Sequence, residues 1–314
     1  MSEAHASAGV IVNAQAGLGL RDPDLERQLK ERLAPRRVLT TRDPGEVAPA
    51  LAELRAMNVE TLVLVGGDGT ISGTLSELVR VWPQAEWPAL VVTAGGSVNT
   101  IARSLGARAA PRAALDRLLE GRAPRETRRP LLRVRADATA SPRCGMIFGT
   151  GFATRWLDAY YASSGRGPAS AARVVGRALL SATAGTRFAR RMCEPFAADL
   201  SVDARAVPGR RFSVVGAATV ADVGLGFRPF HLAGQDPRLF HLLHAEAHPL
   251  RFAFEIPGLR LGQPVPLSCL RHHSASRAAL DLPSPEPWMI DAEIQPPTHR
   301  IEIDLTAPLR FLAF

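Results

Sequence analysis

The residues best placed to do chemistry form the stretch 66–70, Gly-Gly-Asp-Gly-Thr. It directly follows 61–65, a short apolar run typical of a strand buried on both faces of a parallel sheet. Open α/β sheets bind ligands at the carboxyl ends of such strands. Glycines there let backbone N–H groups approach an anion, and Asp68 could hold a metal or a reacting proton. The stretch therefore predicts a ligand-binding turn, although the motif alone equally fits a tight strand–helix turn closed by a capping aspartate.

Two further turns of the same kind follow the expected strands 10–12 and 89–93. They are Asn13–Gly17 and Gly95–Asn99. Because the carboxyl ends of parallel strands lie at one sheet edge, the three turns and the helix N-termini behind them predict an anion pocket suited to phosphates. Neither a P-loop nor a Gly-x-Gly-x-x-Gly fingerprint after the first strand is present, and Lys30 is the only lysine. Phosphate would therefore be held by backbone, hydroxyls, arginine and metal.

The elements that must position these turns alternate between strand and helix. We expect a short polar tail at 1–8 and a doubly wound parallel sheet flanked by helices over 9–130. The expected strands are 10–12, 37–41, 61–65 and 89–93, and the expected helices are 24–33, 46–57, 71–81, 101–106 and 111–120.

Beyond residue 130 the pattern changes to β-rich pieces separated by Pro and Gly. They predict a mostly antiparallel, sandwich-like β domain over 131–306, interrupted by a helical insert at 153–192, and a C-terminal segment, 307–314, that returns to the first domain. The expected β-rich pieces are 131–137, 145–152, 199–206, 211–220, 252–256, 265–273, 277–282 and 299–305.

Composition limits the partners. The net charge of +8, carried almost wholly by arginine, suits a nucleotide, a lipid headgroup or a membrane surface. Only 6% of residues are aromatic and no basic run is interleaved with them, which argues against nucleic acid. Three isolated cysteines fit a reducing compartment, and no signal peptide or transmembrane segment is evident. We therefore expect a cytoplasmic protein that meets a membrane, at its inner face, only peripherally; a homodimer is one option.

The histidines form a separate group. His241 and His244 are three residues apart, and His231, His248 and the pair 272–273 lie near them in sequence. Since they lack a Glu-x-x-His pattern and cysteines at ligand spacing, the sequence favours surface or packing roles over a metal site.

The ordered set of motifs resembles the diacylglycerol/sphingosine lipid kinase family. Residues 66–70 match the first motif of that family, Gly-Gly-Asp-Gly-Thr. The stretch from Gly96 to Arg103 is similar to its second motif, Gly-Thr-x-Asn-Asp-Phe-Ala-Arg. The likeness extends to the first loop, where the family has Asn-Pro-x-Ser-Gly, to Thr41 and 44–46, and to 291–293, where the family has Asp-Gly-Glu. It covers about 9–314.

The resemblance implies an ATP- and Mg²⁺-dependent kinase acting on a lipid hydroxyl, with a cleft between its domains. Asp68 would organise the metal, through the nucleotide, or polarise the nucleophile, and Glu293 would match the family's proton acceptor. The nucleotide-binding residues would be Asn13, Ala14, Gln15, Ala16, Gly17, Thr41, Gly66, Gly67, Asp68, Gly69, Thr70, Ile71, Ser72, Gly96, Ser97 and Asn99.

Some positions depart from the family pattern. Thr100 replaces a family Asp near the expected metal, and Ala292 replaces a Gly. Asp236, in Gln-Asp-Pro, stands where many members have Asp-Asp-Gly at a structural metal site. Ala14 and Ala16 replace the Pro and Ser of the first loop. Two alternatives therefore stay open: a soluble small-molecule kinase like the NAD kinases, which share Gly-Gly-Asp-Gly, and a catalytically silent lipid- or nucleotide-binding protein.

Overall fold

The computed structural model describes residues 7–15, 22, 24–96, 99–139, 141–163, 168–265 and 268–314. The chain divides into two compact units. The first comprises the residues up to Arg129 together with Ala307–Phe314, and the second runs from Pro130 to Thr306.

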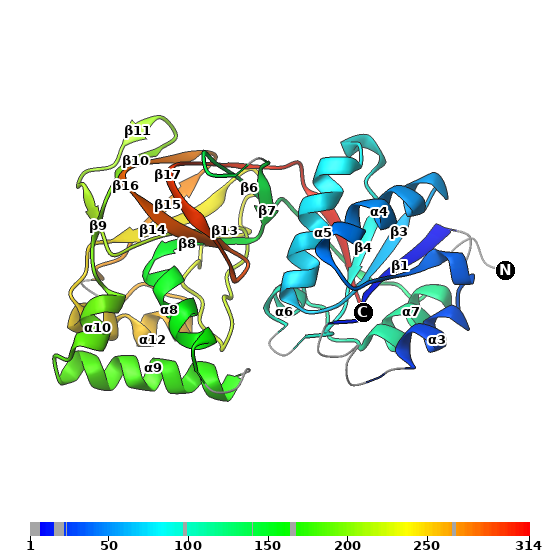
Figure 1. The fold of residues 1–314 in the computed structure, drawn as a ribbon, viewed down its shortest axis with the longest axis horizontal. Helices are drawn as coiled ribbons and strands as arrows, with labels where there is room; N and C mark the ends of the chain where they lie inside the picture. The colour runs from blue at the N-terminus through cyan, green and yellow to red at the C-terminus, as the bar shows by residue number, and fades with distance from the viewer. Residues whose placement is uncertain are drawn as a thin grey trace. The chain divides into compact units, whose positions relative to one another are not determined.

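The first unit is built on a six-stranded sheet in the order β2-β1-β3-β4-β18-β5 (Figure 1). β1, β2, β3, β4 and β18 run parallel, and only β5 is antiparallel to its neighbour β18. The strands are β1 (Ala8–Asn13), β2 (Val38–Thr41), β3 (Thr61–Val65), β4 (Ala89–Val92), β5 (Arg125–Arg129) and β18 (Leu309–Ala313). The last strand of the chain thus extends the sheet formed by the first hundred residues.

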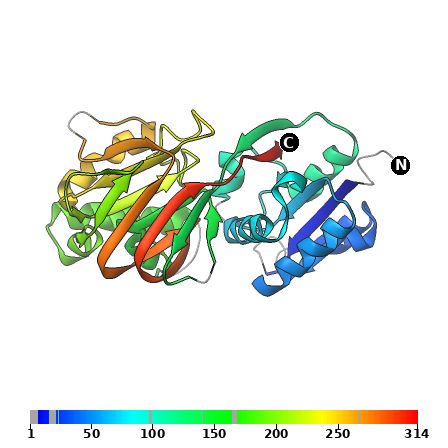
Figure 2. The same cartoon turned by 90° about the horizontal axis from the view of Figure 1, so that it is seen from above.

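Helices cover both faces of this sheet, as the sequence predicts for a doubly wound domain (Figures 1 and 2). α4 packs against α5, and α3 packs against α7. The helices are α3 (Leu25–Lys30), α4 (Val47–Ala56), α5 (Asp68–Val81), α6 (Thr100–Ser104) and α7 (Pro111–Leu119), with 3-10 turns at Pro35–Arg37, Pro44–Glu46 and Gln84–Glu86. Adjacent strand residues, such as Val63 and Leu64, point to opposite faces of the sheet, and both are buried because each face is covered.

The helix after β3 begins at Asp68, three residues earlier than its apolar periodicity predicts. Gly67 is extended and serves as the N-cap, and its carbonyl accepts the Ile71 N–H at 3.0 Å. The motif 66–70 is therefore a strand-to-helix turn whose last three residues already lie in the first turn of α5.

The second unit contains a ten-stranded antiparallel sheet. Its main path is β15-β14-β13-β8-β16-β17-β6-β7, and β10, which carries β11, also pairs with β16. The strands are β6 (Leu132–Ala136), β7 (Arg143–Gly145), β8 (Ile147–Gly151), β10 (Asp199–Val202), β11 (Arg205–Ala206), β13 (Val214–Ala218), β14 (Phe240–Ala245), β15 (Arg271–Ala275), β16 (Ala278–Ile290) and β17 (Glu293–Leu305). β9 (Phe196–Ala197) and β12 (Arg211–Phe212) form a separate two-stranded sheet. Large apolar side chains, including Phe148, Phe240 and Trp288, fill the core of the unit.

In the described part of this unit, five helices accompany the sheet. The helical insert predicted at 153–192 is confirmed as α8 (Phe152–Tyr161), α9 (Pro168–Thr183) and α10 (Arg187–Met192). The strand predicted at 252–256 is wrong, because α11 (Pro249–Phe254) and α12 (Ile256–Leu261) occupy this region. His248 caps α11 by accepting the Leu250 N–H, and Pro249 stands at the first helical position, where its missing N–H costs nothing. These start signals outweigh the β propensity of the Phe-rich run.

The two paired long strands β16 and β17 were only partly predicted. We expected strands at 277–282 and 299–305, but each strand is 13 residues long. The register of their pairing shifts between Asp281 and Glu286 and again between Glu286 and Trp288. Prolines at 283, 285 and 287 hide the strand pattern in the sequence, and the shifts show how the sheet accommodates them. β14 was not predicted as a strand.

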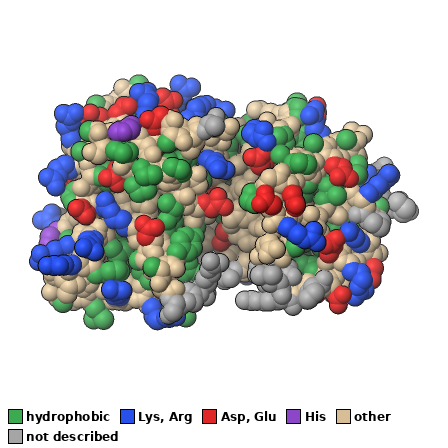
Figure 3. All heavy atoms as spheres, viewed as in Figure 1, with side chains coloured by type: hydrophobic (Ala, Val, Ile, Leu, Met, Phe, Trp, Pro, Cys, Tyr) green, Lys and Arg blue, Asp and Glu red, His purple; other side chains and the backbone are tan. Residues whose placement is uncertain are grey.

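None of the helices in the described part of the chain combines the length and the apolarity needed to span a bilayer. On the face drawn in Figure 3, basic side chains are interspersed with acidic and apolar ones and form no continuous basic tract.

Candidate functional site

The turns after β1 and β3 meet where the sheet order reverses direction. β1 is followed by β2 on one side, whereas β3 lies on its other side and is followed by β4. Ligands bind at such switch points in open α/β sheets. Across this point the Asn13 side-chain amide donates to the Thr70 hydroxyl at 2.7 Å, and Asn13 Oδ1 accepts the Gln15 N–H at 2.8 Å. The first loop is thus fixed to the Gly-Gly-Asp-Gly-Thr turn by side chains that the sequence singled out.

Asp68 joins the turn after β3 to the turn after β4. Its Oδ2 accepts the Thr100 N–H at 2.9 Å and its Oδ1 accepts the Ile101 N–H at 3.0 Å. The carboxylate therefore caps α6 from outside that helix, which is the capping role that the motif left open. Each oxygen keeps a further lone pair, so the capping bonds still leave acceptor capacity for a metal or a donor.

Burial sets the electrostatics of Asp68. Desolvation raises the pKa of its carboxyl above the ordinary 3.8, and it outweighs the lowering by the Thr100 and Ile101 N–H groups and by the Arg103 guanidinium. The anionic form is therefore less favoured than in an exposed aspartate. A cation or a donor that approached this carboxylate would regain that free energy.

Glycine is required where the two turns touch. A Cβ on Gly95 would lie 2.7 Å from the Gly66 carbonyl oxygen, and a Cβ on Gly96 would lie 2.6 Å from the Gly67 Cα. In both pairs the obstacle is backbone, which cannot turn aside as a flexible side chain can. Only glycine therefore lets the backbones of the two turns approach this closely.

Replacing Gly96 with Ala is expected to lower the free energy of unfolding by about 1–3 kcal/mol, because the new methyl forces the two turns apart. The matched control is Gly73→Ala inside α5, where a Cβ meets nothing within 4 Å. There the free energy of unfolding should rise by about 0.5–1 kcal/mol, since alanine is the better helix former. Urea unfolding of both variants measures the difference; an unchanged Gly96→Ala midpoint would contradict the close packing.

Asn99 closes the turn after β4 on itself. Its backbone is left-handed, with φ of 54°, a conformation that Asn tolerates well. Its Oδ1 accepts the Gly96 N–H at 2.6 Å and its Nδ2 donates to the Gly96 carbonyl at 2.9 Å. Asn99 thus shapes the loop, and any contact with a nucleotide would come in addition.

The other predicted nucleotide-binding residues fall into three groups. Thr41 is buried, and its carbonyl accepts the Ala14 N–H at 3.0 Å, so it holds the first loop against β2. The Ile71 and Ser72 side chains are buried in α5, which leaves only backbone groups for a ligand. Ala16, Gly17 and Ser97 lie outside the described residues.

The Asp-Ala-Glu motif of the second unit forms a tight hairpin between β16 and β17. Ile290 pairs with Glu293 across the two-residue loop, and Asp291 and Ala292 have φ of 45° and 71°. Two positive φ values in a two-residue hairpin define a type I′ turn. The buried Asp291 carboxylate accepts the N–H groups of Met146 and Ile147 at 2.8 to 3.1 Å, which fixes the tip of the hairpin to the start of β8.

Glu293 is presented by this anchored tip as the first residue of β17. Its side chain is exposed, yet partial desolvation raises the pKa of its carboxyl above the ordinary 4.5, against the opposing charge of Arg143. The Tyr161 hydroxyl donates to the Ala292 carbonyl at 2.6 Å and supports the same turn. A solvent-accessible carboxyl with a raised pKa on a rigid turn is suited to accept a proton.

The turn carries strain that a single change would remove. Ala292 is left-handed, a conformation that costs an L-residue about 1–2 kcal/mol. Ala292→Gly is therefore expected to raise the free energy of unfolding by about 0.5–1 kcal/mol once the larger entropy of the unfolded glycine chain is subtracted. Ala204 occupies the same place in the Asp-Ala turn between β10 and β11, with φ of 63°. Thermal unfolding should therefore show a higher free energy of unfolding for Ala204→Gly as well.

The control for this prediction is Ala52→Gly in α4, where the helical backbone needs no positive φ. That variant should lose about 1 kcal/mol of stability. Equal losses in all three variants would show that glycine entropy, and not turn strain, dominates.

Asp236, predicted for a structural metal, instead pairs with Arg238. The two side chains meet at 2.9 Å, and the Arg238 hydrogen bond lowers the pKa of Asp236 to about 2. Within the described ranges the one group of three metal-ligating side chains is His231, His241 and His272. The metal role of Asp236 therefore stays a prediction without a second ligand beside it.

A cavity of about 910 Å³ in the second unit was missed by sequence reasoning. Its lining combines Phe212, Phe254 and Val265 with three arginines, Arg211, Arg251 and Arg271. The lining residues come from strands, helices and loops far apart in the sequence, so no local sequence pattern predicts the cavity. Apolar side chains thus lie beside charges of both signs, because Glu246 and Glu255 also line the cavity and Arg211 pairs with Glu246 at 3.4 Å.

The fold and the turn geometry define a class: an open α/β domain whose glycine-containing turns meet at its switch point, followed in the chain by a large antiparallel β unit. Residues 7–126 match the family model "Diacylglycerol kinase catalytic domain", which confirms the family resemblance over this segment. At the level of the family, the match indicates a kinase.

Solved structures agree with this fold. A candidate diacylglycerol kinase from Bacillus anthracis str. Sterne aligns with a TM-score of 0.71 at 16% identity, covering 98% of this chain and 97% of that one. A second structure, named as a diacylglycerol kinase from the same organism, aligns at 0.67 with 15% identity and the same coverage. The predicted fold class is thereby confirmed. No protein among the curated ones matches the sequence significantly.

Proposed function

We propose that this protein is an ATP-dependent kinase that phosphorylates the hydroxyl of a diacylglycerol- or sphingoid-like lipid at a membrane surface. The single observation that carries the proposal is the tied set of turns at the switch point. Asn13, Asp68 and Thr70 connect three loops there, within the segment that matches the kinase catalytic domain.

The donor set fits Mg²⁺ held together with a nucleotide. Mg²⁺ keeps several waters and is bound by one or two carboxylates plus substrate phosphates. Asp68 offers one buried carboxylate with spare lone pairs, and Thr100 offers no second one. Mg²⁺, when bound, would neutralise charge on the transferring phosphoryl group.

The chain's own groups would divide the work of phosphoryl transfer, which is mostly positioning and charge neutralisation. Backbone N–H groups of the turn 66–70 and the N-terminus of α5 would hold phosphate oxygens. Asn13 and Thr70 would keep the loops in register for that contact. Glu293 would take the proton of the acceptor hydroxyl as its oxygen attacks the γ-phosphorus.

A catalytically silent nucleotide- or lipid-binding protein is the second candidate. The observation in its favour is that both carboxylate oxygens of Asp68 already accept N–H groups at the N-terminus of α6, while Thr100 supplies no second carboxylate. ATP could then bind without being placed for transfer.

A transfer assay decides between the two. Purified full chain, γ-labelled ATP and Mg²⁺ are incubated with mixed micelles that carry a panel of diacylglycerols, monoacylglycerols and sphingoid bases. Label on a lipid supports the kinase. ATP binding without label on any lipid would contradict the lipid-kinase proposal and favour the catalytically silent protein. Label on NAD would indicate a soluble small-molecule kinase.

A further inference from the structure

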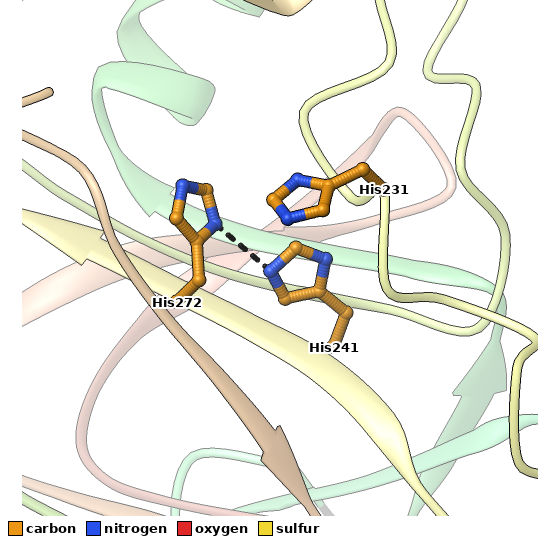
Figure 4. A group of neighbouring side chains, drawn as sticks. All are labelled: His231, His241 and His272. Carbon is orange, nitrogen blue, oxygen red and sulfur yellow. Dashed lines mark hydrogen bonds between the residues drawn. The ribbon is translucent and has the colours of Figure 1, made fainter. Parts of the chain in front are cut away.

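Three histidines of the second unit converge although they are far apart in sequence. One ring nitrogen from each of His231, His241 and His272 lies within 4.8 Å of the others (Figure 4). The ring centroids are 4.7 to 5.0 Å apart, so the rings form a nearly equilateral triangle. His241 is fully buried, and the other two are half-buried. The sequence favoured surface or packing roles here, and a surface role does not fit the fully buried His241.

Strand pairing explains why two of the three meet. β14 and β15 are antiparallel, with His241 opposite Ser274 and Leu243 opposite His272. His241 and His272 are therefore diagonal neighbours on one face of the sheet. The loop between β13 and β14 then brings His231 over them, and Figure 4 shows its ring beside both.

The same two strands carry a second histidine pair on the opposite face. His244 and His273 are also diagonal neighbours, with their Nε2 atoms 3.1 Å apart. Among the described residues no third metal-ligating side chain joins this pair. The described part of the unit thus offers a three-histidine group and a two-histidine group. Neighbouring residues of β14 and β15 supply two members of the first group and both members of the second.

We propose that His231, His241 and His272 bind a Zn²⁺ ion through one ring nitrogen each, with a water as fourth ligand. Three imidazoles with an open fourth position are an established zinc donor set. A cavity of about 10 Å³, lined by His231, His272 and the buried Glu255, adjoins the group and has about the volume that one water needs.

Hydrogen bonding defines the metal-free arrangement of the rings. The Leu232 N–H donates to His241 Nδ1 at 3.2 Å, and His241 Nε2 lies 2.9 Å from His272 Nδ1. The His241 proton is therefore on Nε2 and bridges to His272 Nδ1. Ligation through Nε2 requires this proton to leave, so Zn²⁺ competes with the bridge and binding should release protons.

The metal-free group is also incompletely satisfied, because the buried Nε2 of His272 has no hydrogen-bond partner.

The test is a calorimetric titration of the metal-depleted full chain with ZnCl₂, together with thermal unfolding at increasing Zn²⁺ concentrations. We expect one equivalent to bind and the melting temperature to rise with Zn²⁺ concentration. Co²⁺ in place of Zn²⁺ should give the visible absorption of a tetrahedral site. His231→Ala, which changes only the half-buried loop ligand, should weaken Zn²⁺ binding by about 100-fold or more, since even outer-shell losses cost 10–100-fold.

The matched pair on β15 separates a site from general histidine content. His272→Ala should lose the tight site, whereas His273→Ala, one residue away on the opposite face, should leave the affinity unchanged within about threefold. Absence of a one-equivalent site in the unsubstituted chain would overturn the proposal. So would equal loss in the His273 variant, or unchanged binding in His231→Ala. Because binding is read without kinase turnover, the result is independent of the proposed function.

Discussion

Replacing Glu293 with Gln is expected to lower phosphoryl transfer to the lipid by about 100-fold or more while the protein stays folded and binds ATP normally. A positioned general base contributes about 10²–10⁴-fold, and Gln keeps the size of Glu but cannot accept the proton. The hairpin that presents the residue is held by Asp291 and Tyr161, and neither contact involves the Glu293 side chain. The γ-labelled ATP assay and urea unfolding measure the two effects.

The pH profile gives an independent reading of the same role. A base works when deprotonated, so transfer should rise as pH rises through the pKa of Glu293, which partial desolvation places above 4.5. This acid limb should be missing from Glu293→Gln. Because the raised pKa means that folding disfavours the charged form, removing the charge should not reduce stability near neutral pH.

The control is Glu302→Gln on the same strand. Glu302 forms an exposed ion pair with Arg300 at 2.9 Å, a contact worth about 0–1 kcal/mol. This variant should keep full transfer and the wild-type pH profile. If both variants lost transfer equally, or if Glu293→Gln kept it, Glu293 would be an ordinary exposed strand residue and the proton would need another acceptor.

How far the sequence predicts this fold depends on how local the signal is. The strand 61–65, followed by glycine and then a helical pattern, is set by neighbouring residues, and both of its ends were predicted correctly. α11 was mistaken for a strand because its start signals, His248 and Pro249, compete with a β-prone run. The long strands β16 and β17 were cut short because their pairing tolerates proline through register shifts that only the partner strand reveals.

The candidate site divides along the same line. Spacing was enough to bring Asn13, Asp68 and Asn99 to one sheet edge. It could not reveal that Asp68 caps α6 or that Asn99 closes its own loop, because these bonds depend on the approach of the two turns in space. The histidine triangle is the extreme case, since its members meet through the diagonal of a strand pair and a loop.

The capping role makes Asp68→Ala a poor test of chemistry, and Asp68→Asn a better one. Alanine leaves the Thr100 and Ile101 N–H groups without their acceptor, which should cost about 2–4 kcal/mol of stability. Asn keeps one acceptor oxygen and should cost about 1–2 kcal/mol, so the chain stays folded. Phosphoryl transfer should nevertheless fall by about 1000-fold in Asp68→Asn. The neutral amide can neither hold Mg²⁺ with the nucleotide nor offset the positive charge of the ion.

Asp203→Ala supplies the control for lost capping. Asp203 accepts the Ser276 and Arg277 N–H groups at 3.0 and 2.9 Å, both on Oδ1, and it lies in a β turn of the second unit. It should lose stability without losing transfer by more than the fall in folded protein. Transfer within tenfold of wild type in Asp68→Asn would instead show that this aspartate only holds two turns together. The negative charge at the centre of the Gly-Gly-Asp-Gly-Thr motif would then be structural, and the charge of the transferring phosphoryl group would have to be met by backbone and arginine alone.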